Sequence, residues 1–270
     1  MVVQHNLSAM NTNRQMGVVT SALQKSTEKL SSGYKINRAG DDAAGLSISE
    51  KMRSQIRGLN KASDNAQDGI SLIQVAEGAL NETHSILQRM NELATQAAND
   101  TNTSVDRQSI KDEIKQLNEE LDRISTTTQF NKQDLLTGGF SGKLQVGALE
   151  GQTMDVKISL AVSAKGLSVS AVEVSTNAKA GAAMQSIQDA IESVSKQRSK
   201  LGAIQNRLEH TINNLDTNAE NTQAAESRIR DTDMADEMVQ YSKNNILSQA
   251  GQSMLAQANQ QTQGVLSLLG

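Results

Sequence analysis

The sequence predicts a mainly α-helical protein: a long antiparallel helical bundle of coiled-coil type with a small β-hairpin, plus a two-helix coiled coil formed by the N- and C-terminal segments. Three observations predict this fold class. The 270 residues contain no proline, the residue that breaks helix interiors. Two Tyr, two Phe and no Trp leave the core to aliphatic side chains, Met and Ala. Apolar residues recur at coiled-coil spacing over long stretches.

The first long helix is expected to begin near Gly40-Asp41-Asp42, where an Asp can cap the free N–H groups of the first turn. The turn-forming residues 99–102 end it. Gly58, Gly69 and Gly78 lie inside this helix, and each weakens it by about 1 kcal/mol. We expect the close approach of another helix to explain all three. The apolar stripe, with steps of three, four or seven residues, consists of Met52, Ile56, Leu59, Ala66, Ile70, Ile73, Leu80, Leu87, Met90, Ala94 and Ala97.

Two more helices are predicted from apolar residues at the same spacing. The second has Ser104 or Asp106 as its predicted cap, and the third is predicted to begin around Ala182. Antiparallel packing of the three long helices is the economical arrangement. The polar run at 213–221 is predicted to loosen or re-phase the third helix. The stripes of the two helices are Ile110, Ile114, Leu117, Leu121 and Ile124, and Met184, Ile187, Ile191, Val194, Leu201, Leu208 and Leu215.

A β-hairpin is predicted near 143–162. Apolar and polar residues alternate there on both sides of a turn at Glu150-Gly151. Because a lone hairpin is marginally stable in water, we expect it to pack on the helices. Residues 138–142 are glycine-rich but open no helix, which favours a turn over a phosphate-binding loop. The stretch 163–179 could add a short strand or form a loop.

Both ends of the chain are nearly free of charge. Only His5 can titrate before Arg14, and no Asp, Glu, Lys or Arg follows Lys243. Their helical stripes are thin, and packing supplies most of a helix's stability. We therefore hypothesise that the terminal helices stay largely disordered in the monomer and fold when copies of the chain assemble. The candidates for packing in such an assembly are Leu7, Met10, Leu23, Leu30, Met238, Leu247, Met254, Leu255, Val265 and Leu266.

Composition excludes several function classes. The net charge of −4 argues against a nucleic-acid partner, and no apolar run approaches the length of a membrane span. No cysteine is present for a disulfide or metal site. His5, His84 and His210 are isolated from one another, and no H-E-x-x-H motif occurs. We expect no enzyme activity, no cofactor and no metal. The N-terminus lacks the basic and apolar regions of a cleaved signal peptide.

Several segments carry a family resemblance. Residues 30–37 (LSSGYKIN) and 41–46 (DDAAGL) resemble the N-terminal signature of bacterial flagellin. Residues 201–215 (LGAIQNRLEHTINNL) and 254–260 (MLAQANQ) are similar to its C-terminal signature. The likeness covers nearly the whole chain. Thr262 stands where the family usually has proline, and Asn91 stands where it usually has a basic residue.

The resemblance implies an extracellular subunit of the bacterial flagellar filament. Residues 1–41 and 226–270 would form a terminal-helix domain in the filament core, and 42–225 a helical domain with the hairpin. The family's variable outer domains would be absent. Implied partners are other copies of the chain, an export chaperone, and the cap and hook-associated proteins. Export would use the flagellar type III apparatus, without a cleaved signal peptide.

The resemblance also implies recognition by the Toll-like receptor that senses flagellin. Arg89, Leu93 and Glu113 match the family's receptor-contact positions, and Gln88, Glu92 and Gln96 are further contact candidates. Two alternatives to a filament subunit stay open. One is a hook–filament junction protein with similar terminal helices. The other is a secreted helical binding module that does not polymerise.

Overall fold

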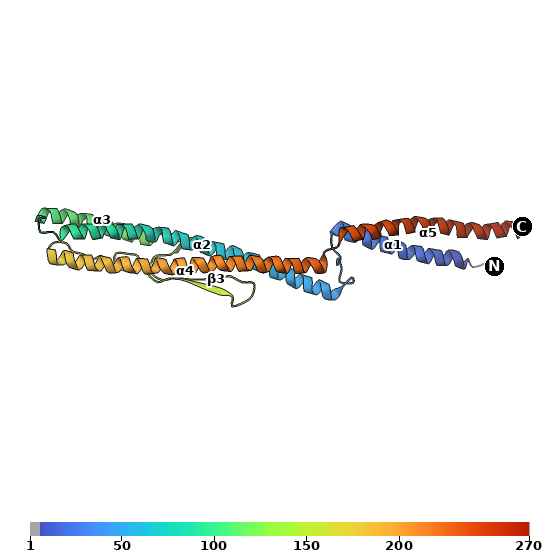
Figure 1. Ribbon diagram of the computed structural model, residues 1–270, viewed down its shortest axis with the longest axis horizontal. Coiled ribbons are helices and arrows are strands. Elements are labelled where there is room, and N and C mark those ends of the chain that lie inside the picture. Colours follow the sequence, from blue (N-terminus) through green and yellow to red (C-terminus); the bar gives the residue numbers. More distant parts are fainter. Residues whose placement is uncertain (1–5, 270) are drawn as a thin grey trace. The chain divides into compact units, whose positions relative to one another are not determined.

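The computed structural model describes the backbone of residues 6–269 and the side-chain environment of residues 6–260 (Figure 1). Contacts divide the chain into two compact units: one formed by the chain up to Ser54 together with the chain from Asn221 on, the other by Gln55–Glu220. The predicted mainly α-helical class is confirmed. The helices are α1 (Leu7–Ser32), α2 (Ala43–Ala97), α3 (Ser104–Thr127), α4 (Asn177–Arg230) and α5 (Met234–Leu269).

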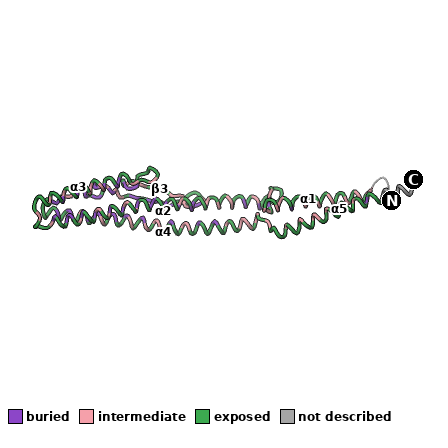
Figure 2. Tube along the Cα trace, turned by 90° about the horizontal axis from the view of Figure 1, so that it is seen from above, coloured by how far each residue is buried: buried purple, intermediate pink, exposed green. Residues whose placement is uncertain are grey.

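In the second unit, α2 packs antiparallel to α3 and to α4, in agreement with the predicted antiparallel bundle. The Ser63 hydroxyl of α2 donates a hydrogen bond to Asp216 of α4 at 3.0 Å, whereas Asn177 at the start of α4 reaches the carbonyl of Ala98, just past the end of α2. The facing stripes are buried along the unit (Figure 2). Members of its core include Leu80, Leu87, Met90, Ile114, Leu121, Ile187, Val194, Leu201 and Leu208.

The prediction that 213–221 loosens the third helix is wrong. Helix α4 is continuous there, and the buried stripe continues through Leu215 and Ala219 against Leu59 and Ala62 of α2. The polar residues of this run face outward or find partners across the helix pair. Helix α4 also begins earlier than predicted, at Asn177, because the Thr176 hydroxyl accepts a hydrogen bond from the Lys179 N–H at 3.3 Å.

Side-chain caps also fix the starts of α2 and α3. An Asp caps α2 as predicted, and of the two candidates it is Asp42, which accepts a hydrogen bond from the Gly45 N–H at 2.9 Å. For α3 both predicted caps are wrong, because Thr103 is the N-cap. Asp106 reaches back and accepts from the Thr103 N–H at 2.8 Å and from its hydroxyl at 2.7 Å. The hydroxyl and then the backbone N–H of Thr103 lower the pKa of the Asp106 carboxyl.

The predicted hairpin is formed by β3 (Phe140–Gln145) and β4 (Thr153–Ile158), paired antiparallel. It packs on the helices: Asn65 of α2 donates to the Gln145 carbonyl at 3.1 Å. A two-residue pair, β1 (Gln129–Phe130) with β2 (Gln133–Asp134), has no counterpart in the prediction. Residues 163–176 form no strand. They are a loop that covers the core with Ala164, Leu167, Val169 and Val174.

The three glycines of α2 have different surroundings. A Cβ at Gly58 would lie 2.8 Å from the Cβ of Ala148, and a Cβ at Gly69 would collide with Leu144. These two positions therefore make room chiefly for the hairpin and its loop rather than for a helix, which corrects the expectation. A Cβ at Gly78 would meet no atom within 4 Å. Among residues 6–260, no neighbour explains why a helix-weakening residue stands there.

In the first unit, α1 and α5 pair antiparallel, which confirms the predicted two-helix coiled coil (Figure 1). The Asn6 amide donates to the Ala258 carbonyl at 3.0 Å, and Lys29 lies 3.4 Å from Glu237. Few side chains are fully sequestered: in α1 and the described part of α5, only Ser26 and Ala258 are buried (Figure 2). Packing between these two helices alone stabilises them weakly.

The segment between α1 and α2 is held against the end of α4. The Arg230 guanidinium stacks 4.7 Å from the Tyr34 ring centroid and donates to Glu50 at 3.0 Å. Backbone hydrogen bonds from Lys35 to Arg230 and from Thr232 to Gly33 complete the contact. A cation over an aromatic face adds to the ion pair. The same unit therefore has well-packed residues beside its sparsely packed terminal helices.

Candidate functional site

The terminal helix pair exposes apolar side chains. Nine large ones are exposed on α1 and the described part of α5: Leu7, Met10, Val18, Met234, Met238, Val239, Ile246, Leu247 and Met254. Val239 and Ile246 are seven residues apart and therefore share a face of α5. Exposed apolar residues that share a helix face are typical of a protein–protein interface. We call these nine residues the terminal apolar surface.

The predicted assembly residues fall into three groups. Five of them belong to the terminal apolar surface: Leu7, Met10, Met238, Leu247 and Met254. Three are half-buried at the helix pair: Leu23, Leu30 and Leu255. The side chains of Val265 and Leu266 lie outside the described residues. Val18, Met234, Val239 and Ile246 are additions that the sequence reasoning missed, although their helical spacing was visible in the sequence.

A second surface lies where α2 passes α3. Arg89 of α2 donates two hydrogen bonds to one carboxylate oxygen of Glu113 of α3, from Nε at 3.0 Å and from Nη2 at 2.9 Å. Its Nη1 donates to Glu92 at 3.2 Å. The bonds to Glu113 first, and to Glu92 second, raise the pKa of Arg89. The side chains of Arg89 and Glu113 are 51% and 44% exposed, so this ion pair adds little to stability and stays accessible.

The predicted receptor-contact residues divide in two. Gln88, Arg89, Glu92, Gln96 and Glu113 are exposed. We call these five the Arg89 patch. Leu93 is only 2% exposed and belongs to the core, because it lies on the side of α2 that faces the bundle. Its side chain can support the patch from beneath.

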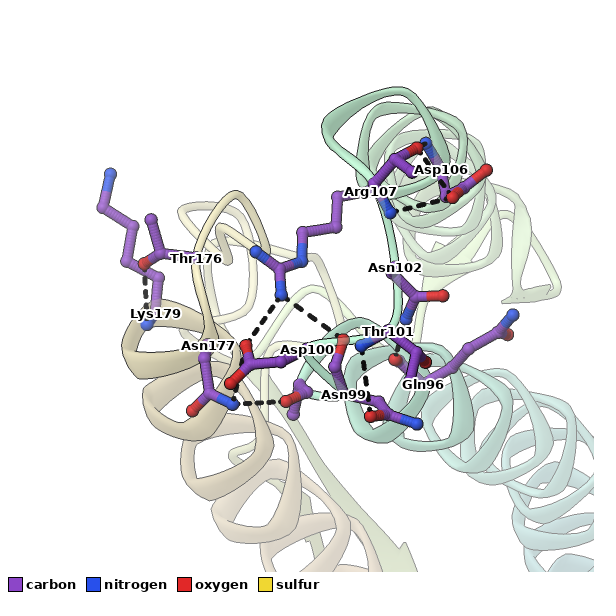
Figure 3. A network of polar contacts seen from close by, with 12 residues as sticks. Gln96, Asn99, Asp100, Thr101, Asn102, Asp106, Arg107, Thr176, Asn177 and Lys179 are labelled. Atoms are coloured by element: carbon purple, nitrogen blue, oxygen red, sulfur yellow. Dashed lines mark hydrogen bonds and ion pairs between the residues drawn. The ribbon is translucent and has the colours of Figure 1, made fainter.

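A polar network fixes the turn between α2 and α3 (Figure 3). Arg107 of α3 donates to the Asn99 carbonyl at 3.3 Å and to the Asp100 carboxylate at 3.2 Å. Asn102 bonds the Gln96 carbonyl, and Asn177 of α4 bonds that of Ala98. The carbonyls of Gln96, Ala98 and Asn99, at the end of α2 and just beyond it, thereby accept side-chain hydrogen bonds. The network holds α3 in the register that places Glu113 opposite Arg89.

In the part of the chain that the structure describes, no three His, Asp or Glu side chains gather in an arrangement that could hold a metal ion. His84 lies 3.0 Å from Gln88, and His5 is outside the described residues. The described helices include none that combines the length and apolar character needed to cross a membrane.

Long antiparallel helices with apolar stripes, and a terminal pair whose apolar surface is open, define a coiled-coil structural protein with surfaces for other chains. Family models give the particular family. The bacterial flagellin N-terminal helical region matches residues 3–141, and the bacterial flagellin C-terminal helical region matches residues 184–269. The chain belongs to the bacterial flagellin family. Only residues 142–183 separate the two matched regions, so this is a compact member of the family.

Individual relatives agree. The chain is 56% identical over 271 residues to a flagellin of Halalkalibacterium halodurans, and 52% identical over 304 residues to the flagellin of Bacillus subtilis (strain 168). Each alignment covers 100% of both chains. Among solved structures, a crystal structure of Bacillus cereus flagellin has 34% identity and a TM-score of 0.51. It covers 60% of this chain and 94% of that one.

Proposed function

We propose that this chain is a structural subunit that polymerises into the bacterial flagellar filament outside the cell. Membership of the flagellin family supports a filament subunit. The observation that carries the proposal is the terminal apolar surface. It is exposed to solvent when α1 and α5 pair only with each other. A repeated contact that does not close on itself generates a helical filament. In this proposal, residues 1–41 and 226–270 form the filament core, and 42–225 form the adjoining helical domain.

Electron microscopy of the purified protein tests this proposal. Monomer is added to short filament seeds and incubated under conditions that favour assembly. We expect long filaments of constant diameter. A hook–filament junction protein would add only a short terminal layer to the seeds, and a non-polymerising binding module would add none. Either of those outcomes would overturn the filament-subunit assignment.

The charge-free C-terminal tail supports a role in export. No charged side chain follows Lys243, and the polar residues are mostly amides such as Gln249, Gln252 and Gln257. A channel lined by such residues would not bind passing segments of opposite charge. We propose that the tail lines the central channel of the filament and that export uses the flagellar type III apparatus. An export chaperone would cover the apolar residues of the tail, and the cap and hook-associated proteins would contact the two filament ends.

A second proposal concerns recognition by the flagellin-sensing Toll-like receptor. The Arg89 patch is exposed, and its arginine is already oriented by Glu113 and Glu92. Arginine is a favoured interface anchor because its planar guanidinium donates several hydrogen bonds at once. We expect the patch to bind the receptor ectodomain, with Leu93 fixing the helix from below.

The double variant Arg89→Ala, Glu113→Ala tests the patch. We expect its affinity for the ectodomain, measured by surface plasmon resonance, to fall at least tenfold, as for loss of one anchor residue. The matched control is Arg123→Ala, Glu120→Ala, which removes an exposed ion pair of α3 outside the patch. The control should bind like the parent. Unchanged affinity of the Arg89, Glu113 variant would refute the proposed contact.

A further inference from the structure

Methionine is concentrated on the terminal apolar surface. Four of the nine residues of this surface are methionines, with exposed fractions between 47% and 65%: Met10, Met234, Met238 and Met254. We call them the four exposed methionines. Outside this surface, the exposed large apolar residues among residues 6–260 are Ile48, Val75, Val105 and Leu149, and none of these is a methionine. The most accessible thioether groups of the described chain therefore lie where copies of the chain are proposed to meet.

The other described methionines are shielded from solvent to a greater extent. Met90 and Met154 are 0% and 8% exposed and belong to the core of the Gln55–Glu220 unit. Met16, Met52 and Met184 are half-buried. Because the exposure of a side chain governs how readily an oxidant in solution reaches it, we expect the four exposed methionines to react first.

The thioether is the side chain of this protein that reacts most readily with a mild peroxide, since the sequence has no cysteine and no tryptophan to compete for the reagent. The sulfur lone pair attacks one peroxide oxygen, the O–O bond breaks and an S–O bond forms. Methionine loses two electrons and becomes methionine sulfoxide. Hydrogen peroxide takes up these electrons, and its second oxygen leaves with both hydrogens as water.

Oxidation changes the chemistry of the terminal apolar surface while leaving the core intact. A sulfoxide is polar, whereas the thioether is an adaptable apolar group that fills gaps in a packed interface. Met234 and Met238 are four residues apart on α5, so two of the four sulfurs lie on one face of this helix. All four side chains are exposed in the monomer, so the sulfoxides disturb no packed core. The effect therefore falls on assembly rather than on the fold of the Gln55–Glu220 unit.

We propose that the four exposed methionines form an oxidation-sensitive switch for assembly: a peroxide converts them to sulfoxides in the free chain, and the oxidised chain no longer adds to polymer. The inference rests on the proposed function, because it requires neighbouring copies to cover the terminal apolar surface. It holds whether α1 and α5 are paired or unfolded in the monomer, since the sulfurs are accessible in both cases. Methionine sulfoxide reductases return the sulfoxide to the thioether with two electrons from thiols and release the oxygen as water, so the switch is reversible.

Treatment of the purified monomer with hydrogen peroxide tests the proposal. Mass spectrometry of peptides measures the sulfoxide at each position, and we expect it to form about tenfold faster at the four exposed methionines than at Met90 and Met154. The monomer concentration needed for growth on untreated parent seeds should then rise about tenfold or more, because apolar burial is lost from the contact. The thermal unfolding transition of the Gln55–Glu220 unit should stay unchanged.

Leucine substitutions separate oxidation at this surface from oxidation elsewhere, because leucine is apolar, close to methionine in volume and inert to peroxide. The quadruple variant Met10→Leu, Met234→Leu, Met238→Leu, Met254→Leu is compared with its own untreated sample, and peroxide should not change its growth. The matched control is Met16→Leu, Met52→Leu, Met184→Leu, which keeps the four exposed methionines. Peroxide should impair the growth of this control as strongly as that of the parent.

The outcomes separate this inference from the proposed function. Equal growth of treated and untreated parent would overturn the switch, and so would loss of growth of the quadruple variant on peroxide treatment. Methionine sulfoxide reductases for both sulfoxide epimers, supplied with a dithiol, should restore the growth of treated parent, and this rescue decides the matter if the quadruple variant does not grow on seeds at all. A loss that the reductases do not reverse would also overturn the switch. Failure of the untreated parent to grow would instead overturn the filament proposal on which the switch rests.

Discussion

Deletion of residues 1–14, or of residues 243–270, is expected to abolish filament growth and leave the Gln55–Glu220 unit folded. Either deletion removes part of the terminal apolar surface, which includes Leu7 and Met10 at one end and Ile246, Leu247 and Met254 at the other. Each deletion shortens one helix of the pair, so the other loses packing contacts and the stability that they supply. Filament growth is measured as the critical concentration, the monomer concentration above which polymer forms, and by electron microscopy. A cooperative thermal unfolding transition shows that the Gln55–Glu220 unit is still folded.

A variant that keeps the full length isolates the role of apolar contact. Val239→Gln with Ile246→Gln changes two exposed residues on one face of α5. Because both side chains are exposed in the monomer, its unfolding should be unaffected within about 0.5 kcal/mol. The critical concentration for filament growth should rise by a large factor.

For the two deletions, filaments of normal length from either truncated chain would contradict the assigned role of the terminal apolar surface.

Leu201→Ala is expected to destabilise the monomer by about 2–5 kcal/mol, because it opens a cavity in the core of the helical bundle. Leu201 is completely buried on α4, within the cluster that joins α2, α3 and the hairpin. The free energy of unfolding, from denaturant titration followed by circular dichroism, measures the loss.

Leu7→Ala is the matched control for the core substitution. The same atoms are removed, but Leu7 is 71% exposed. Its monomer should unfold within about 0.5 kcal/mol of the parent, as for ordinary surface substitutions. The critical concentration of Leu7→Ala for filament growth should nevertheless rise above that of the parent. Equal destabilisation by the two substitutions would show that the assignment of core and assembly residues is wrong.

Much of the fold follows from local periodicity. Long runs of apolar residues at steps of three, four and seven predict α2 and α4, and two-residue alternation predicts the β3–β4 hairpin. The prediction of an Asp cap at the start of α2 is correct because the partner of Asp42, the Gly45 N–H, lies three residues away in the chain. A hydrogen bond between residues that are close in sequence can be predicted from the sequence alone.

The errors have tertiary causes. The polar run at 213–221 resembles a break, but Leu215 and Ala219 keep the stripe of α4 buried against α2. At α3, both predicted caps lie within one to three residues of the true cap Thr103, so spacing alone could not choose between them. The role of Gly58 depends on where the hairpin loop folds back, which local pattern does not encode.

Candidate interaction residues were predicted less completely than the fold. The positions taken from the family resemblance include Arg89 and Glu113, which lie side by side in the structure. They also include Leu93, which lies on the buried face of α2. Pairs such as Arg230–Glu50 and Arg198–Glu77 depend on which helices pack and in which register. Such pairs join residues more than a hundred positions apart, and single-sequence reasoning has no signal for them.

Hydrogen exchange of backbone amides, compared between monomer and filament, tests the central claim most directly. The claim is that α1 and α5 obtain their stability from neighbouring copies of the chain. We expect amides of Leu7–Leu30 and of Met234–Met254 to exchange rapidly in the monomer, while those of the α2–α4 core are protected. In the filament both terminal segments should become strongly protected. Strong protection of α1 in the monomer would contradict the account.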